Sequence, residues 1–194
     1  HKKVLLIDLD SQGSSGLNVG IDVADEDVNT IDVLLGAYVD RKIETFDWED
    51  VKNFIYTPTF FSRKRVEGTA KWETVYLPYG FDVMPSDLPL SLVELRMSMA
   101  GNNNPSGKVY SYYVYDLIQC IKENTDYDYI IIDTPPALGT LSVNAMMAAT
   151  NGIIIPSNLD IMSFRGISSF KESADYVQTS AMNRGIEHRG ILGI

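Results

Sequence analysis

The stretch that most restricts the fold is residues 129–133, in which one tyrosine and three isoleucines precede an aspartate. Such a continuous run of β-branched and aromatic residues predicts a strand of a parallel sheet that is buried on both faces. The strand is expected to end at Asp133, because Pro135 and Pro136 follow Thr134 and a proline has no N–H group to donate to a neighbouring strand. The pattern therefore predicts that the Asp133 carboxylate lies at the edge of the sheet.

A second apolar stretch, residues 4–10, ends in the same way, with Asp8 and Asp10, and a turn rich in glycine and serine follows at 11–16. Ligands of open parallel sheets bind at the carboxyl ends of the strands. We therefore expect Asp8, Asp10 and Asp133 to converge on one site, around a hard cation that prefers oxygen ligands. The alternative for each aspartate is a structural role as the cap of the helix that follows.

The rest of the chain alternates between helical and strand patterns, which predicts an α/β fold with a mainly parallel, helix-flanked sheet. Helices are expected at 31–35, 90–100, 110–124, 141–149 and 163–179, and short strands at 75–77 and 81–85, joined by a tight turn. Residues 153–155 predict a third buried strand, and a last strand begins at 191. Since both ends of the chain fall in or beside strands, we interpret residues 1–194 as one domain that is truncated at both ends.

Residues 37–78 differ in character, because they combine many aromatic residues with charges and show no long helical or strand period. We interpret this block as an insertion that packs its aromatic side chains onto the main body. The alternative is that residues 60–65, two phenylalanines followed by a serine and three basic residues, contact a partner or a nucleic acid.

Composition limits the possible functions. The formal net charge of −10 argues against broad binding of phosphate backbones by the whole chain, although it allows a local basic patch. The single cysteine, Cys120, excludes an internal disulfide and a multi-cysteine metal site, and its apolar helical setting predicts a buried structural thiol. No apolar run approaches the ~20 residues of a membrane-spanning helix, so we expect a cytoplasmic protein with no membrane role.

Several of these segments together resemble the ParA/MinD family of deviant Walker-type P-loop ATPases, and most closely the ParA and Soj-like partition proteins. Residues 6–13 are similar to the switch I segment of that family, and residues 129–136 to its Walker B strand and switch II. The order and spacing of the motifs match over most of the chain, and 37–78 is the main unmatched block. The matching segments are 4–16, 30–36, 81–95, 127–149, 153–156 and 190–193.

This resemblance implies a role for each site residue. Asp10 positions the water that attacks the γ-phosphate, and Asp133 holds Mg²⁺ through a water. Asp8 supports the nucleotide region, while Gln12 and the segment Thr134, Pro135 and Pro136 belong to switches that sense the γ-phosphate.

For the intact protein, the resemblance implies a function in plasmid or chromosome partition. ATP binding and hydrolysis switch dimerisation and non-specific DNA binding, and a centromere-binding ParB-like protein is the partner. The ATP-bound homodimer is nucleoid-associated. The candidate DNA contacts are the basic residues of the last third of the chain, Arg165, Lys171, Arg184 and Arg189.

The chain departs from the family in one important respect, because it contains no glycine-rich phosphate loop with its lysine. In the family this loop lies just upstream of where this chain begins, so the domain is expected to lack its N-terminal phosphate-loop segment.

Two other functions remain open. One is a non-catalytic adaptor that keeps the ATPase fold. The other is a haloacid-dehalogenase-type phosphohydrolase with Asp8 as nucleophile and Asp10 as general acid, although Gln12 stands where that family has threonine or valine.

Overall fold

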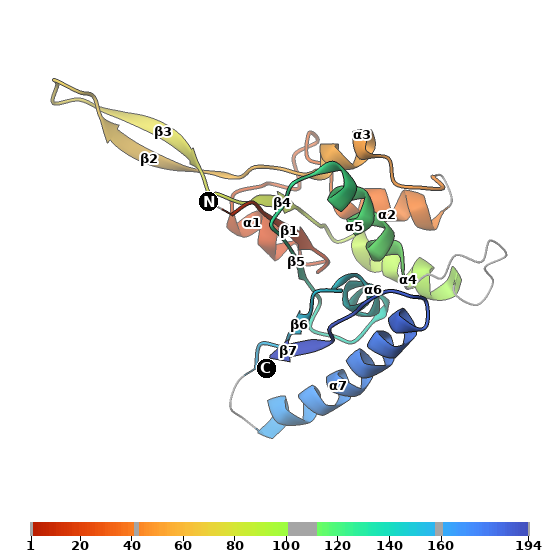
Figure 1. The fold of residues 1–194 in the computed structure, drawn as a ribbon. Coiled ribbons are helices and arrows are strands. Elements are labelled where there is room, and N and C mark those ends of the chain that lie inside the picture. The colour runs from red at the N-terminus through yellow and green to blue at the C-terminus, as the bar shows by residue number, and fades with distance from the viewer. Residues whose placement is uncertain (1, 41–42, 101–111, 158–160, 194) are drawn as a thin grey trace.

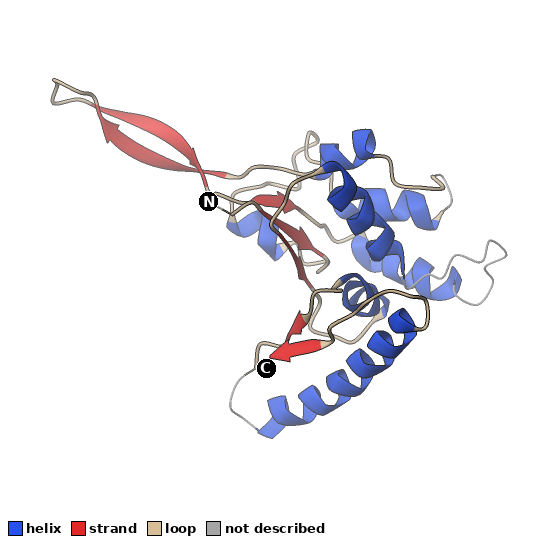
Figure 2. Ribbon diagram, viewed as in Figure 1, coloured by secondary structure: helices blue, strands red, loops and turns tan. Residues whose placement is uncertain are grey.

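A computed structural model describes residues 2–40, 43–100, 112–157 and 161–193 (Figure 1). Strands and helices alternate along most of the chain (Figure 2), as the sequence predicts. In chain order the elements are β1 (Val4–Asp8), α1 (Ser14–Asn18), α2 (Ile31–Val39), α3 (Trp48–Val51), the 3₁₀ helix η1 (Lys52–Phe54), β2 (Thr59–Arg65), β3 (Trp72–Pro78), β4 (Asp82–Met84), α4 (Leu90–Ala100), α5 (Tyr113–Asn124), β5 (Tyr129–Asp133), α6 (Thr140–Ala148), β6 (Ile153–Ile154), α7 (Ile161–Met182) and β7 (Ile191–Gly193).

The central sheet is parallel, with the strand order β4–β1–β5. Asp8 lies opposite Asp133 in its register, so the two predicted strand ends do meet at one edge. A second parallel pair is formed by β6 and β7, while β2 and β3 make an antiparallel hairpin. The predicted α/β class with a mainly parallel sheet is therefore confirmed.

The main core lies between the central sheet and its helices. Leu5 and Ile7 of β1 are fully buried, and they belong to one apolar cluster with side chains of α2, α4, α5 and α6. A smaller cluster joins α6, β6 and α7. Helix α5 has its buried residues at helical spacing, because Val114, Leu117, Ile118 and Ile121 lie on one face of the helix. Burial of this face explains why a helix forms here.

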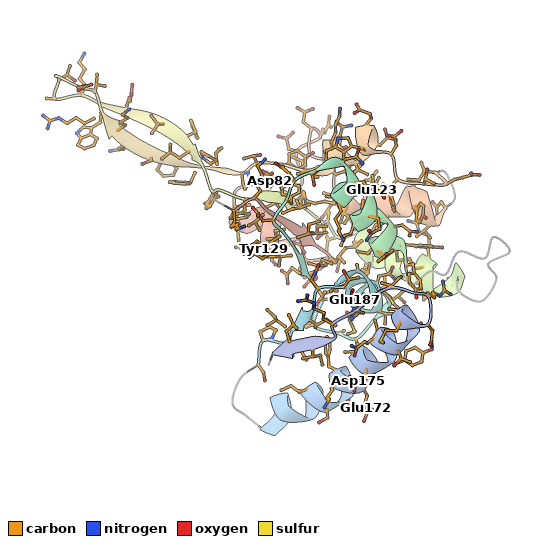
Figure 3. All side chains as sticks on the ribbon, in the orientation of Figure 1. Asp82, Glu123, Tyr129, Glu172, Asp175 and Glu187 are labelled. Carbon is orange, nitrogen blue, oxygen red and sulfur yellow. The ribbon has the colours of Figure 1, made fainter. Side chains whose placement is uncertain are left out.

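The prediction that β5 is buried on both faces is wrong. Tyr129, labelled in Figure 3, and Ile131 are each more than half exposed. Among the described residues β5 pairs only with β1, so its other edge is open. Ile130 and Ile132 pack against the core from one face, and the face of Tyr129 and Ile131 is uncovered. The third strand also differs from its prediction, because Ile153 is buried but Ile154 is 74% exposed.

Residues 37–78 are only partly the packed insertion that the sequence predicts. The half-buried side chains of Phe46, Trp48 and Phe54 do pack against the core. The second half of the block instead forms the β2–β3 hairpin, which projects away from the body (Figure 1).

Several smaller expectations need correction. Helix α2 continues through Gly36 to Val39, four residues beyond its predicted end at 35, because Leu34, Leu35 and Tyr38 extend its buried face. The two strands predicted at 75–77 and 81–85 are present as β3 and β4, and they belong to different sheets, because β3 pairs with β2 and β4 pairs with β1. Cys120 packs against the core from α5 but is only partly buried. The predicted start of helix α5 at 110 lies outside the described residues.

Candidate functional site

Three loops meet at the carboxyl end of the central sheet, one after each parallel strand. The loops after β1 and β5 are joined directly, because the backbone N–H of Leu9 donates to the carbonyl oxygen of Asp133 over 2.9 Å. The loop after β4 joins them through the hydroxyl of Ser86, which donates to the carbonyl oxygen of Asp10. Parallel pairing of the strands thus places the predicted site residues in one region.

Asp8 lies inside this region with its side chain fully buried, at 0% exposed. Both carboxylate oxygens accept backbone hydrogen bonds, Oδ1 from the N–H of Asp10 at 2.9 Å and Oδ2 from the N–H of Ser15 at 3.0 Å. Burial raises the pKa of the Asp8 carboxyl above its usual value, and the two N–H groups act in the opposite direction. Asp8 therefore holds the turn that follows β1 and does not face solvent.

Asp10 sits within that turn and is partly exposed. Its Oδ1 accepts the backbone N–H of Gln12 at 3.0 Å, which makes a local turn of the Asx type. The chain then reverses at Gly13, whose φ of 61° is left-handed and which leads into α1. The Gln12 side chain is exposed beside this turn.

Asp133 has an exposed side chain at the end of β5, where the sequence predicts it. Its Oδ2 accepts a hydrogen bond of 3.0 Å from the hydroxyl of Ser15. Since the N–H of Ser15 binds Asp8, this one serine ties the two strand-end carboxylates together. Thr134 and Pro135 are half-buried and Pro136 is exposed in the loop that leads from β5 towards α6.

The expected convergence of three carboxylates on a cation is wrong. In the described part of the chain no group of three His, Cys, Asp or Glu residues is placed to hold a metal ion. The reason is that Asp8 is fully buried with each oxygen accepting a backbone N–H group, and the Asp10 carboxylate accepts an N–H group of its own loop. One exposed carboxylate, Asp133, with the Ser15 hydroxyl beside it, still suits Mg²⁺, which keeps several of its waters and takes one or two carboxylates.

Ser15 and Ser86 are the site residues that sequence reasoning missed. Ser15 contacts Asp133, 118 residues away in the sequence, and Ser86 contacts Asp10, 76 residues away, so no local pattern marks either serine.

A separate hollow of about 630 Å³ lies at the hairpin tip, lined by residues 64–70.

The basic residues predicted to contact DNA that the structure describes lie on α7 and between α7 and β7. Lys171 is exposed on α7, and the guanidinium of Arg184 lies over the ring of Tyr112, 4.6 Å from its centroid. Arg189 is exposed just before β7. The side chain of Arg165 lies outside the described residues.

Comparison with known proteins identifies the family. The model of the AAA domain family matches residues 1–188, so the chain belongs to that family, and within it the chain is a ParA-like P-loop ATPase domain. It is 29% identical over 98% of its length to the chromosome partitioning protein ParA of Caulobacter vibrioides, and 28% identical over 98% to the sporulation initiation inhibitor protein Soj of Bacillus subtilis. The resemblance seen in the sequence is thereby confirmed.

The fold is also shared with a solved structure, cobyrinic acid a,c-diamide synthase from Mycobacterium smegmatis with bound ATP analog and magnesium. Its TM-score is 0.63 at 21% identity, over 98% of this chain and 59% of that one. The chain spans 57% of the length of the Caulobacter relative and 60% of the Bacillus relative. None of the helices in the described ranges combines the length and apolar character that crossing a membrane requires.

Proposed function

We propose that the intact protein is a ParA-like ATPase that uses ATP binding and hydrolysis as a switch in plasmid or chromosome partition. The observation that carries the proposal is the linkage of the two strand ends by Ser15, where a partly exposed Asp10 and an exposed Asp133 lie beside a buried Asp8. The similarity of the whole chain to ParA and Soj supports the same function.

Each residue has a distinct part in this proposal. The Asp10 carboxylate would orient the attacking water, and the Asp133 carboxylate would help to hold Mg²⁺. Bound Mg²⁺ neutralises charge on the phosphates. Asp8 fixes the turn that presents Asp10, and Gln12 and the loop Thr134–Pro136 respond to the γ-phosphate.

The phosphate loop itself is proposed to come from a further parallel strand that pairs with the open edge of β5. Two observations support this position. The free edge of β5 ends at Asp133, and Ile131 on the same strand is exposed although it is apolar. A neighbouring strand would pair with the backbone groups that β5 leaves open at this edge among the described residues, and it would extend the sheet beside Ile131.

A surface of α4 supports a homodimer as the ATP-bound state. Three exposed apolar side chains of this helix, Leu92, Leu95 and Met99, recur at helical spacing and form one stripe, and the exposed Leu88 lies in the turn just before the helix. The same helix contacts the start of α6, because Glu94 Oε1 accepts the backbone N–H of Leu141 at 3.0 Å. A change in the conformation of the loop before α6 would therefore be transmitted through Glu94 to α4, which carries the stripe.

The test is ATP turnover with Mg²⁺, measured on this chain and on the protein extended upstream. We expect turnover only in the extended protein, and we expect Asp10→Ala to reduce it by roughly two orders of magnitude. Asp22→Ala is the matched control, since Asp22 makes the same type of turn, accepting the N–H of Ala24 at 3.0 Å.

Absence of ATP binding in both proteins would contradict the proposal and favour the non-catalytic adaptor. An aspartyl-phosphate trapped on Asp8 would favour the phosphohydrolase, but the full burial of Asp8 argues against a nucleophile there. DNA and a ParB-like protein are the proposed partners of the ATP-bound dimer.

A further inference from the structure

The β2–β3 hairpin is a regular two-stranded ribbon with a hydrogen-bonded turn. Seven residue pairs are in register, from Thr59 opposite Pro78 to Arg65 opposite Trp72. The turn is closed by the N–H of Val66, which donates to the carbonyl of Lys71 at 2.9 Å. Side chains project from both sides of the ribbon beyond the body (Figure 3).

The two faces of this ribbon differ in chemistry, because side chains alternate along a strand and paired residues share a face. One face carries apolar and hydroxyl side chains together with the opposed pair Lys64 and Glu73. At its base Phe60 contacts the ring of Tyr79, with 5.2 Å between centroids, and Tyr79 contacts Phe81. This face therefore ties the ribbon to the body.

The opposite face, which we call the aromatic–arginine face, has no such support. It consists of Thr59, Phe61, Arg63, Arg65, Trp72, Thr74, Tyr76 and Pro78. Phe61 is 74% exposed, Tyr76 73% and Trp72 64%. Neither strand contributes a carboxylate to it, although the whole chain has a formal net charge of −10.

A surface of this kind is expected to be covered in the working protein. An isolated two-stranded ribbon is only marginally stable in water, and exposed aromatic clusters mark interaction sites. The turn also fixes the position of the Arg65 guanidinium near the hairpin tip, because its Nε donates to the carbonyl of Thr69 at 3.0 Å.

We infer that the aromatic–arginine face binds nucleic acid. Guanidinium groups pair with phosphates, and aromatic rings stack on bases. A two-stranded ribbon also has the width to enter the major groove of a DNA duplex. The absence of carboxylates on this one face matches a polyanion and not a generally hydrophobic partner.

The inference rests on the proposed function and deepens it, because it places the nucleic-acid contact on the hairpin and not on the scattered basic residues near α7. The hairpin lies on elements separate from Asp10 and Asp133. Binding and hydrolysis are therefore measurable independently on the same variants.

The experiment measures binding of fluorescently labelled oligonucleotides by anisotropy, with a single-stranded 20-mer and the same sequence as duplex. Arg63→Gln and Lys64→Gln form a matched pair, since each removes one positive charge from adjacent residues that face opposite sides. We expect Arg63→Gln to weaken binding of at least one of the two oligonucleotides about tenfold and to lower the salt dependence, and Lys64→Gln to weaken it less than about twofold.

A second pair tests the aromatic contact. We expect Trp72→Ala to weaken binding about tenfold or more, because stacking on a base is lost. Tyr176→Ala is its control, because Tyr176 is a similarly exposed aromatic residue on α7. All four variants are expected to keep the ATP turnover of the extended protein, and Asp10→Ala is expected to keep hairpin binding.

Equal losses within either matched pair would overturn the inference, as would an absence of binding to both oligonucleotides by the unaltered extended protein in low salt with ATP. Hairpin variants that change only the oligomeric state, measured by light scattering, would also overturn it and assign the face to a second copy of the chain. Loss of turnover in Asp10→Ala with intact hairpin binding separates the two proposals.

Discussion

Substitution of Asp8 by asparagine tests whether this carboxylate acts as the internal support of the site. The side chain is fully buried, and each of its oxygens accepts one backbone N–H. An asparagine retains one acceptor but places an amide NH₂ group against the second N–H donor. One charge-assisted hydrogen bond is lost, and a buried donor is left without a partner.

The expected loss in the free energy of unfolding is about 1.5 kcal/mol at pH 7, at the low end for hydrogen bonds to charged groups. The low end applies because burial raises the pKa of Asp8, so folding already disfavours its ionised form. With a urea m-value of roughly 2 kcal/mol/M, Asp8→Asn lowers the unfolding midpoint by about 0.7 M. The two tryptophans and far-UV circular dichroism provide the signal.

Asp10→Asn is the matched control, because the Asp10 side chain accepts only the N–H of Gln12 and an amide oxygen replaces it. Its midpoint is expected to change by less than the equivalent of about 0.5 kcal/mol.

The pH dependence of the Asp8→Asn effect has a definite sign. A raised pKa in the folded state gives a stabilisation that is complete below the unfolded pKa and is lost as the pH rises through the folded pKa. The difference between the unaltered chain and Asp8→Asn is therefore wider at pH 4 than at pH 7. Equal midpoints for the two proteins, or an equally large fall in Asp10→Asn, would refute the support role.

Three further predictions concern stability. Burial raises the pKa of Asp32, and its Oδ1 has no hydrogen-bond partner, so the ionised carboxylate destabilises the fold at pH 7. Asp32→Asn is therefore expected to raise the free energy of unfolding by about 0.5–1 kcal/mol at pH 7 and by almost nothing near pH 4. Urea unfolding at both pH values measures this difference. His188→Ala is expected to cost about 2–4 kcal/mol, because the buried imidazole contacts the carbonyl of Met146 at 2.7 Å and accepts a backbone N–H at 3.0 Å, and an unchanged melting temperature would contradict it. Gly13 and Gly20 both have positive φ, but of the two only Gly13 would bring a Cβ against a backbone oxygen, at 2.6 Å. Gly13→Ala is therefore expected to lower the melting temperature more than Gly20→Ala. The control Gly20→Ala is expected to lose about 1–2 kcal/mol of the free energy of unfolding from the positive φ alone.

The parallel sheet and its strand ends are predictable from the sequence because their signals are local. A run of isoleucines with an aspartate and two prolines marks β5 and its end at Asp133 without reference to any other segment. Burial is different, since it depends on what covers the strand. The predicted burial of β5 on both faces is wrong because, among the described residues, only the face of Ile130 and Ile132 packs against the core, while Tyr129 and Ile131 on the other face stay more than half exposed.

The hairpin and the serine contacts were not predictable for related reasons. Strand β2 carries charged and aromatic residues with little alternation of polarity, because most of its residues are exposed. Ser15 depends on Asp133, far along the chain. Sequence patterns report a segment's own preferences, and these features come from contacts between segments.

The open edge of β5 has a consequence for handling the isolated chain. Residues 129–132 combine high β propensity with no charge, and on the edge away from β1 their N–H and C=O groups, which pair with no other strand in the part of the chain that the structure describes, form a template on which another strand can add. Purified alone at high concentration, the chain is expected to form cross-β aggregates that grow from this edge. Ile131→Lys, which places a charge on the exposed face of the edge strand, is expected to slow that growth.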